Sequence, residues 1–322
     1  MFDTHCHLNF EAFNGQVERV IDEAKKVGVN QIVIPGTDVE TSKKAVEIAE
    51  KYEGIYAAIG IHPHHVFEIY SESSIPKFFI GKQQTEKNLI SSLSKIQKQK
   101  SLHNLNIEKN SFASDLDKIK NLLKNKKVVA IGEIGIDRHI YQKTKYSDYK
   151  MYQEFVDLQK VFFLEQIKLA HKYNKAIIIH NREAKKDVLK ILTDLTDSTD
   201  LTEYRSVFHC CEPDPELLEF AKKHRMFIGV DGDITYYKEK QNFIKTVPLE
   251  MLVLETDSPF LIPRLKNTRL RKTTARQSNE PKNIPLIAEF VAKLKGVSIN
   301  RLIEKTTENA QVLFKVRPFS KD

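Results

Sequence analysis

The sequence predicts an α/β protein, a single (β/α)8 barrel of the TIM type over residues 1–322. Eight short apolar runs alternate with amphipathic segments along the chain, which is the pattern of repeated βα units. The length of 322 residues suits one large barrel or two smaller domains, and we find no internal repeat or second domain. Polar residues gather at the C-terminal ends of the apolar runs, where barrels of this type carry their sites.

The expected strands are short runs rich in Val, Ile and other apolar residues. They cover residues 2–8, 31–36, 55–62, 128–137, 175–180, 206–210, 226–230 and 251–257. Between them, apolar residues spaced three and four apart predict helices. These helices cover residues 17–27, 39–52, 155–173 and 215–224. Two further helical segments, residues 284–295 and 299–314, are expected to close the ring and pack across it.

A long polar stretch, about residues 71–114, interrupts the third βα unit. Its richness in Lys, Ser, Asn and Gln is typical of a solvated or disordered insertion; an active-site flap is the alternative. Most of the net charge of +8 lies in this stretch and the residues that follow it up to the fourth expected strand. Residues 71–127 contain 12 Lys and five Asp or Glu, whereas the rest contains 39 basic and 38 acidic residues. The net charge is therefore a poor guide to a nucleic-acid partner.

The three cysteines, of which Cys210 and Cys211 are adjacent, make no disulfide framework and fit a reducing compartment. No run of uncharged apolar residues is long enough to span a bilayer, so we expect no membrane partner. If Met1 is the native start, a cleaved signal peptide is not expected either, because a candidate metal ligand lies at position 5. We therefore expect a cytoplasmic protein. A monomer is compatible with the sequence, which does not define the oligomeric state.

His5 and His7 form the most informative motif, near the start of the chain. Alternate side chains of an extended segment share a face, so the two imidazoles point the same way. Two imidazoles on one face can bind one divalent ion. The motif is only suggestive alone, because His-x-His also occurs by chance in surface strands.

Further histidines and carboxylates end later strands. Period-two counting places Ile131, Glu133 and Asp137 on one face of the fourth strand. Glu133 lies in a nearly wholly apolar run, and buried acids are rarely left unpaired. Because strand ends converge at one mouth of a barrel, we expect a site there for one or two divalent ions, Mg2+, Mn2+ or Zn2+. Its candidate members are His5, His7, Glu133, His180, His209 and Asp257.

Six ordered motifs carry a resemblance to a known family. They are DTHCHL at residues 3–8, GIHPH at 60–64, GEIGID at 132–137, HNREA at 180–184, ETDSP at 255–259 and NEP at 279–281. With them the chain resembles the TatD family of metal-dependent deoxyribonucleases, which are amidohydrolase-like barrels, over nearly its full length. The resemblance implies one metal held by His5, His7, Glu133 and Asp257. It also implies a second metal held by His180 and His209, with Glu133 bridging.

The chemistry expected is hydrolysis of DNA phosphodiesters, exo- or endonucleolytic. A divalent ion can lower the pKa of a bound water and polarise a phosphoryl oxygen. Asp257 is the candidate general base, since a carboxylate beside this water can accept its proton. Glu133 is expected to act as the shared ligand, and His62, at the end of the third strand, to donate to a phosphate oxygen. Glu255 is expected to support a ligand from the layer below.

Arginines near the mouth are candidates for contact with the DNA backbone, because guanidinium groups pair bidentately with phosphate. Arg182 follows a candidate ligand, and Arg269 and Arg271 lie in a loop, residues 264–276, that contains no acid. The alternative is a solvated loop with scattered cations.

Four other side chains are expected to lie outside the site. His64 and His65 are expected on an exposed loop, and Cys6 and Cys210 are expected to be buried small hydrophobes that face the helices.

Two other functions are also compatible with the sequence. One is a metal-dependent hydrolase of amide or ester bonds, including aminoacyl ester bonds on tRNA, because related barrels use similar ligands. The other is a non-catalytic nucleic-acid-binding protein. Its mark would be the loss of a ligand or of Asp257, and neither is lost. The sequence does not identify the metal or choose between DNA and RNA.

Overall fold

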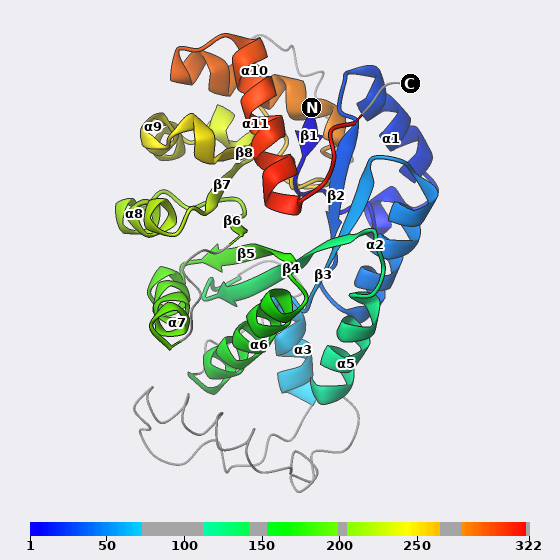
Figure 1. The fold of residues 1–322 in the computed structure, drawn as a ribbon, viewed down its shortest axis with the longest axis vertical. Coiled ribbons are helices and arrows are strands. Elements are labelled where there is room, and N and C mark those ends of the chain that lie inside the picture. The colour runs from blue at the N-terminus through cyan, green and yellow to red at the C-terminus, as the bar shows by residue number, and fades with distance from the viewer. Residues whose placement is uncertain (73–111, 142–152, 199–204, 265–277, 320–322) are drawn as a thin grey trace, which may run out of the picture.

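The computed structural model describes residues 1–72, 112–141, 153–198, 205–264 and 278–319. It confirms the (β/α)8 barrel: eight strands form one parallel sheet in the order β1 to β8, with helices between them (Figure 1). The strands are β1 Phe2–Asp3, β2 Gln31–Pro35, β3 Ile55–Ile59, β4 Val128–Asp137, β5 Ala176–Arg182, β6 Ser206–Phe208, β7 Phe227–Val230 and β8 Leu252–Leu254. The segments after β1 and β8 also pair, since Cys6 forms a parallel bridge to Ser258, so the barrel is nearly closed.

Ten α-helices lie in the described part of the chain, and four of them match the predicted amphipathic segments to within two residues. They are α1 Val17–Lys26, α2 Val39–Lys51, α3 Pro63–Glu72, α5 Phe112–Leu122, α6 Gln153–Lys172, α7 Lys185–Ser198, α8 Pro215–Lys223, α9 Lys238–Thr246, α10 Ile284–Lys295 and α11 Ile299–Phe314. Side-chain caps define some starts. Asp38 Oδ1 accepts from Thr41 N at 2.7 Å at the start of α2, which satisfies an otherwise unpaired amide.

The predicted insertion at residues 71–114 lies mostly outside the described residues. Its two ends differ from the prediction, because residues 71 and 72 belong to α3 and residues 112–114 belong to α5. Both flanking helices pack on the barrel, α3 against α6 and α5 against α2.

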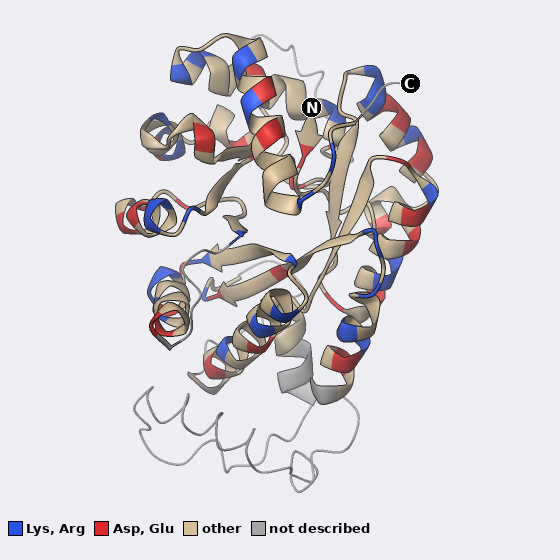
Figure 2. Cartoon of the chain, in the orientation of Figure 1, with Lys and Arg blue, Asp and Glu red and all other residues tan. Residues whose placement is uncertain are grey.

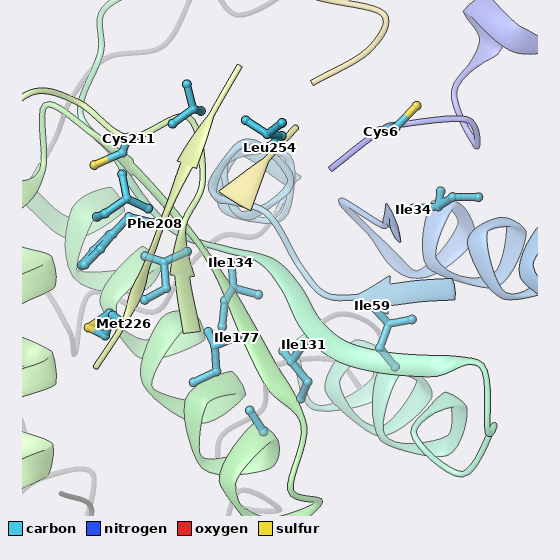
Figure 3. Packing of buried hydrophobic residues seen from close by; sticks show 14 of the residues in the cluster. Cys6, Ile34, Ile59, Ile131, Ile134, Ile177, Phe208, Cys211, Met226 and Leu254 are labelled. Carbon is cyan, nitrogen blue, oxygen red and sulfur yellow. The ribbon is translucent and has the colours of Figure 1, made fainter. Parts of the chain in front are cut away.

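Apolar side chains form two cores, one on each side of the sheet. The outer core lies between strands and helices and includes Ile34, Ile59 and Ile177, as Figure 3 shows. The inner core fills the barrel and includes Val33 and Ile178. Neighbours such as Val33 and Ile34 therefore face opposite sides, as the period-two pattern predicts.

Helix α11 closes the inner core at the N-terminal end of the strands. Leu313 and Phe314 join that core, and Asn309 Nδ2 donates to Leu249 O at 2.9 Å and Leu252 O at 2.8 Å, beside the start of β8. This confirms the prediction that the last helix packs across the ring.

The prediction for β4 was wrong in one respect. Ile131 and Glu133 were expected on one face, but Ile131 packs in the outer core whereas the Glu133 carboxylate lies inside the barrel, 3.3 Å from His5 Nε2. The pairing of β4 with β5 shifts register between Ile131 and Ile134. An irregularity of this kind adds a residue and reverses the alternation beyond it.

Charged residues lie mainly on the helices, whereas the strands are almost free of them (Figure 2). All ten residues of β4 are buried, so its two acids stand out against an apolar background. Within the described residues, no helix combines the length and apolarity needed to cross a membrane.

Candidate metal centre

His5 and His7 lie just beyond β1, which ends at Asp3 rather than continuing through residue 8 as predicted. The Asp3 carboxylate organises this segment: it accepts hydrogen bonds from His5 N at 3.2 Å, Thr256 N at 3.0 Å and Thr256 Oγ1 at 2.7 Å. Burial raises the pKa of Asp3 to about 8, although these hydrogen bonds oppose the rise. Asp257 N donates to His5 O at 2.9 Å. The segments after β1 and β8 are thereby held side by side.

Four donor atoms converge beside these segments. His5 Nε2 and His7 Nε2 lie 3.1 Å apart. Glu133 Oε2 lies 3.3 and 3.6 Å from them, and Asp257 Oδ1 lies 3.7 and 3.5 Å from them. Ligands about 2.0–2.2 Å from one tetrahedral ion are about 3.4 Å apart. The spacing therefore fits a common divalent ion.

Two glycines of β4 allow β5 to approach closely enough to bring Glu133 beside His180. A Cβ on Gly132 would lie 2.5 Å from Ile178 Cβ, and a Cβ on Gly135 would lie 1.8 Å from His180 O. Gly135 also has a φ of +156°, which side chains other than hydrogen disfavour. The two glycines of the GEIG sequence are therefore needed for backbone packing, whereas its glutamate supplies a candidate ligand.

The other Glu133 oxygen faces a second group of imidazoles. Glu133 Oε1 lies 2.7 Å from His180 Nδ1, 3.4 Å from His62 Nε2 and 3.7 Å from His209 Nε2. His209 also stacks on the His5 ring, with centroids 3.5 Å apart. Glu133 thus contacts the two groups through different oxygens, an arrangement that suits a bridging role.

The outward ring nitrogens of three histidines have acceptors. His7 Nδ1 lies 3.2 Å from Pro35 O, His180 Nε2 lies 3.1 Å from Asp137 Oδ2, and His209 Nδ1 lies 3.1 Å from Glu255 Oε1. A neutral imidazole that donates from its outward nitrogen presents a lone pair from the other one. The inward nitrogens of all three are therefore suited to bind a metal. Glu255, as expected, supports His209 from below.

His62 has the opposite tautomer. Its Nδ1 accepts from His64 N at 3.0 Å, and burial lowers the pKa of His62 to about 3. The ring is therefore neutral, and its proton lies on Nε2, which points toward Glu133 and His180. A protonated nitrogen donates and cannot bind a metal, so the geometry suits the predicted role as a donor to substrate.

The electrostatics of the centre favour a cation. Burial opposes ionisation of Glu133, yet the surrounding His62, His209 and His5 hold the pKa of its carboxyl well below the usual range. Burial likewise opposes protonation of His180 and His209, but neighbouring carboxylates raise the pKa values of these imidazoles to about 9 and about 10. Buried carboxylates require cationic partners, which protonated imidazoles provide here and which divalent ions would provide in their place.

Sequence reasoning missed a cluster of polar residues around Asp137. Asp137 Oδ2 lies 3.0 Å from His64 Nε2 and accepts from Tyr141 Oη at 2.8 Å, in addition to its contact with His180. The prediction of an exposed loop for His64 and His65 was wrong, because α3 begins at Pro63 and both rings are half-buried on its first turn. Pro at the first helical position was the available signal.

Arg182 lies at the exposed end of β5, beside this cluster. It donates to Tyr141 Oη at 3.1 Å, and its guanidinium lies 5.2 Å from the centre of the Tyr141 ring. Arg269 and Arg271 lie outside the described residues, so their contact with the DNA backbone stays a prediction.

The cysteines differ from one another. Cys6 and Cys211 are buried in the outer core, as predicted for Cys6. The prediction for Cys210 was wrong, because it lies in a polar cluster with Asp231 and Asp233, 3.8 Å from Lys240 Nζ. The ammonium of Lys240 already occupies the position that a cation would take there.

The four histidines predicted as ligands, His5, His7, His180 and His209, lie together with buried carboxylates at the mouth of a (β/α)8 barrel. This combination is typical of metal-dependent hydrolases. The model of the family described as TatD related DNase matches residues 2–315, and the chain belongs to this family. The resemblance seen in its motifs is thereby confirmed, and the protein is a hydrolase of the TatD type.

Individual relatives agree with this assignment. The uncharacterized metal-dependent hydrolase YabD of Bacillus subtilis is 31% identical over 318 residues, which cover 98% of this chain and 99% of that protein. The 3'-5' ssDNA/RNA exonuclease TatD of Yersinia pseudotuberculosis is 27% identical over 321 residues, 98% of this chain and 100% of that one. The crystal structure of YJJV, a TatD homolog from Escherichia coli, shares the fold with a TM-score of 0.71 at 24% identity, covering 98% of both chains.

Proposed function

We propose that this protein is a metal-dependent deoxyribonuclease that hydrolyses phosphodiester bonds of DNA. The observation that carries the proposal is the convergence of donor atoms from His5, His7, Glu133 and Asp257. The two histidine nitrogens lie 3.1 Å apart, and each lies 3.3–3.7 Å from a carboxylate oxygen of Glu133 and of Asp257. A relative of nearly equal length is named a 3'-5' ssDNA/RNA exonuclease, which supports a nucleic-acid substrate.

We assign six residues as ligands of one or two divalent ions, Mg2+, Mn2+ or Zn2+. They are His5, His7, Glu133, His180, His209 and Asp257. When bound, such ions would supply a water of lowered pKa and polarise a phosphoryl oxygen. The inward-facing ring nitrogens of His7, His180 and His209, and the two differently directed oxygens of Glu133, support this assignment.

Asp257 and His62 have separate roles in the proposal. Asp257 accepts the proton of the attacking water, since its side chain is 15% exposed whereas that of Glu133 is 5% exposed. His62 donates from Nε2 to a nonbridging phosphate oxygen, as its tautomer allows. Arg182, Arg269 and Arg271 hold the phosphate backbone on the rim of the mouth.

The test is a comparison of substrates at one enzyme concentration with divalent ions present. We expect cleavage of labelled DNA that depends on the protein and is lost in Asp257→Asn prepared in parallel, which controls for contaminating nucleases. Labelled RNA, an aminoacyl-tRNA and an amide substrate are assayed beside it. Hydrolysis of the aminoacyl ester or the amide without cleavage of DNA would overturn the proposal in favour of an amide or ester hydrolase.

A further inference from the structure

Several exposed apolar side chains lie at the mouth of the barrel. Among the described residues, six large hydrophobic side chains are exposed. Three of them follow the carboxyl ends of strands: Ile140 after β4, Tyr237 after β7 and Phe260, which is 50% exposed, after β8. Apolar surface beside a polar site marks a place where a ligand is bound.

Phe260 lies beside the candidate metal centre, where one backbone hydrogen bond and two ring contacts hold it. Its backbone N donates to Asp257 O at 2.8 Å. Its ring lies 6.4 Å from both the His7 and the Phe10 rings, at interplanar angles of 71° and 74°. Those two rings stack on each other at 4.2 Å. Edge-to-face contacts of this kind orient an aromatic ring, yet half of the Phe260 surface stays open to solvent.

We propose that Phe260 is a stacking platform for an unpaired nucleobase next to the cleaved phosphodiester. This inference rests on the proposed function and names the form of its substrate. The ring contacts the ring of the candidate ligand His7, and the Phe260 backbone bonds to that of the candidate base Asp257. A nucleotide whose phosphate lies at the centre therefore has its base within reach of Phe260. Stacking on an aromatic ring requires a base that has left its duplex neighbours, which favours single strands and frayed ends.

Charge on the neighbouring loops fits the same substrate. Arg182 lies at the exposed end of β5, and Arg264, after β8, lies 4.4 Å from the centre of the Tyr236 ring. Cations beside open aromatic rings are the combination that binds single-stranded nucleic acid without reading its sequence. Phe260 therefore sets the preference for unpaired substrate rather than the chemistry of the bond.

The experiment removes the base and the ring in turn. Single-stranded oligonucleotides carry one tetrahydrofuran abasic residue at successive positions flanking the cleaved bond, and kcat/KM is measured for each. In the wild type, we expect a loss of at least about fivefold at one position, the lower end of what stacking one base contributes. Phe260→Leu keeps apolar volume but removes the ring. We expect it to lower kcat/KM on the intact strand similarly and to show little further loss with the abasic strand.

Two further variants complete the test. Phe260→Tyr restores an aromatic face and is expected to restore the discrimination between intact and abasic strands. Val312→Ala removes another exposed apolar side chain, 64% exposed on α11 far from the mouth, and is expected to match the wild type. Thermal unfolding of each variant confirms that the fold is kept.

Three results would overturn the inference. Equal cleavage of intact and abasic strands by the wild type, or an equal abasic penalty in Phe260→Leu, shows that no base stacks on this ring, while the proposed deoxyribonuclease function stands. Absence of DNA cleavage by the wild type overturns the proposed function itself and the inference with it. The two failures are therefore distinguishable.

Discussion

Asp257 differs from the other acids of the centre in its access to water. Its side chain is 15% exposed, whereas those of Asp137 and Glu255 are fully buried. Asp257→Asn keeps the shape but removes both the acceptor and a charged ligand, so we predict a loss of at least about 100-fold in kcat on labelled DNA. Asp117→Asn, on an exposed part of α5, serves as the matched control. Near-normal kcat in Asp257→Asn with metal still bound would exclude Asp257 as the base.

His180 and His209 predict an unusual pH dependence for the metal-free protein. Their folded pKa values of about 9 and about 10 lie above the unfolded value of about 6.5. Their contribution to stability is therefore complete below pH 6.5 and is lost as the pH rises through about 9. Urea unfolding of chelator-treated protein should show stability falling between about pH 6.5 and 10. Protein loaded with a divalent ion should not show this fall, because ion binding requires deprotonated imidazoles. A flat profile without metal would contradict these pKa values.

At the scale of elements, Lys240 of α9 holds the turn after β7. Its buried Nζ lies 3.0 Å from Asp231 Oδ2 and 2.7 Å from Asp233 Oδ1. Lys240→Met would leave these carboxylates without a cation, so we predict a loss of about 3–5 kcal/mol in the free energy of unfolding. Lys245→Met, exposed on the same helix, should change it by less than about 0.5 kcal/mol. Urea unfolding measures both. Equal stability of the two variants would show that the Lys240 ion pairs add nothing.

Regular elements were predictable from the sequence, and irregular ones were not. Period-two alternation holds in the regular strand β2, where Val33 faces the inner core and Ile34 the outer core. It failed at Ile131, since a register shift reverses the alternation before Glu133. The contact of His64 with Asp137 joins residues 73 apart. It depends on how two elements pack, which no local pattern contains.

At the scale of the whole molecule, the barrel is complete without the polar insertion. Helices α3 and α5 both pack on it, so the deletion should spare them. We predict that replacing residues 73–111 by a short Gly/Ser linker shifts Tm by less than about 4 °C, the change that about 1 kcal/mol produces in a large domain. The number of bound ions should not change. A much lower Tm, or insoluble protein, would show that the segment is structural.

Removal and return of the divalent ion tests whether the clustered histidines and carboxylates form a catalytic metal centre. Protein is dialysed against a chelator until no divalent ion is detected, and cleavage of labelled single-stranded DNA is measured before and after adding Mg2+, Mn2+ or Zn2+. We predict that cleavage falls to background without metal and returns with at least one of these ions in the wild type but not in Asp257→Asn. Undiminished cleavage by the metal-free protein would show that these histidines and carboxylates do not form a catalytic metal centre.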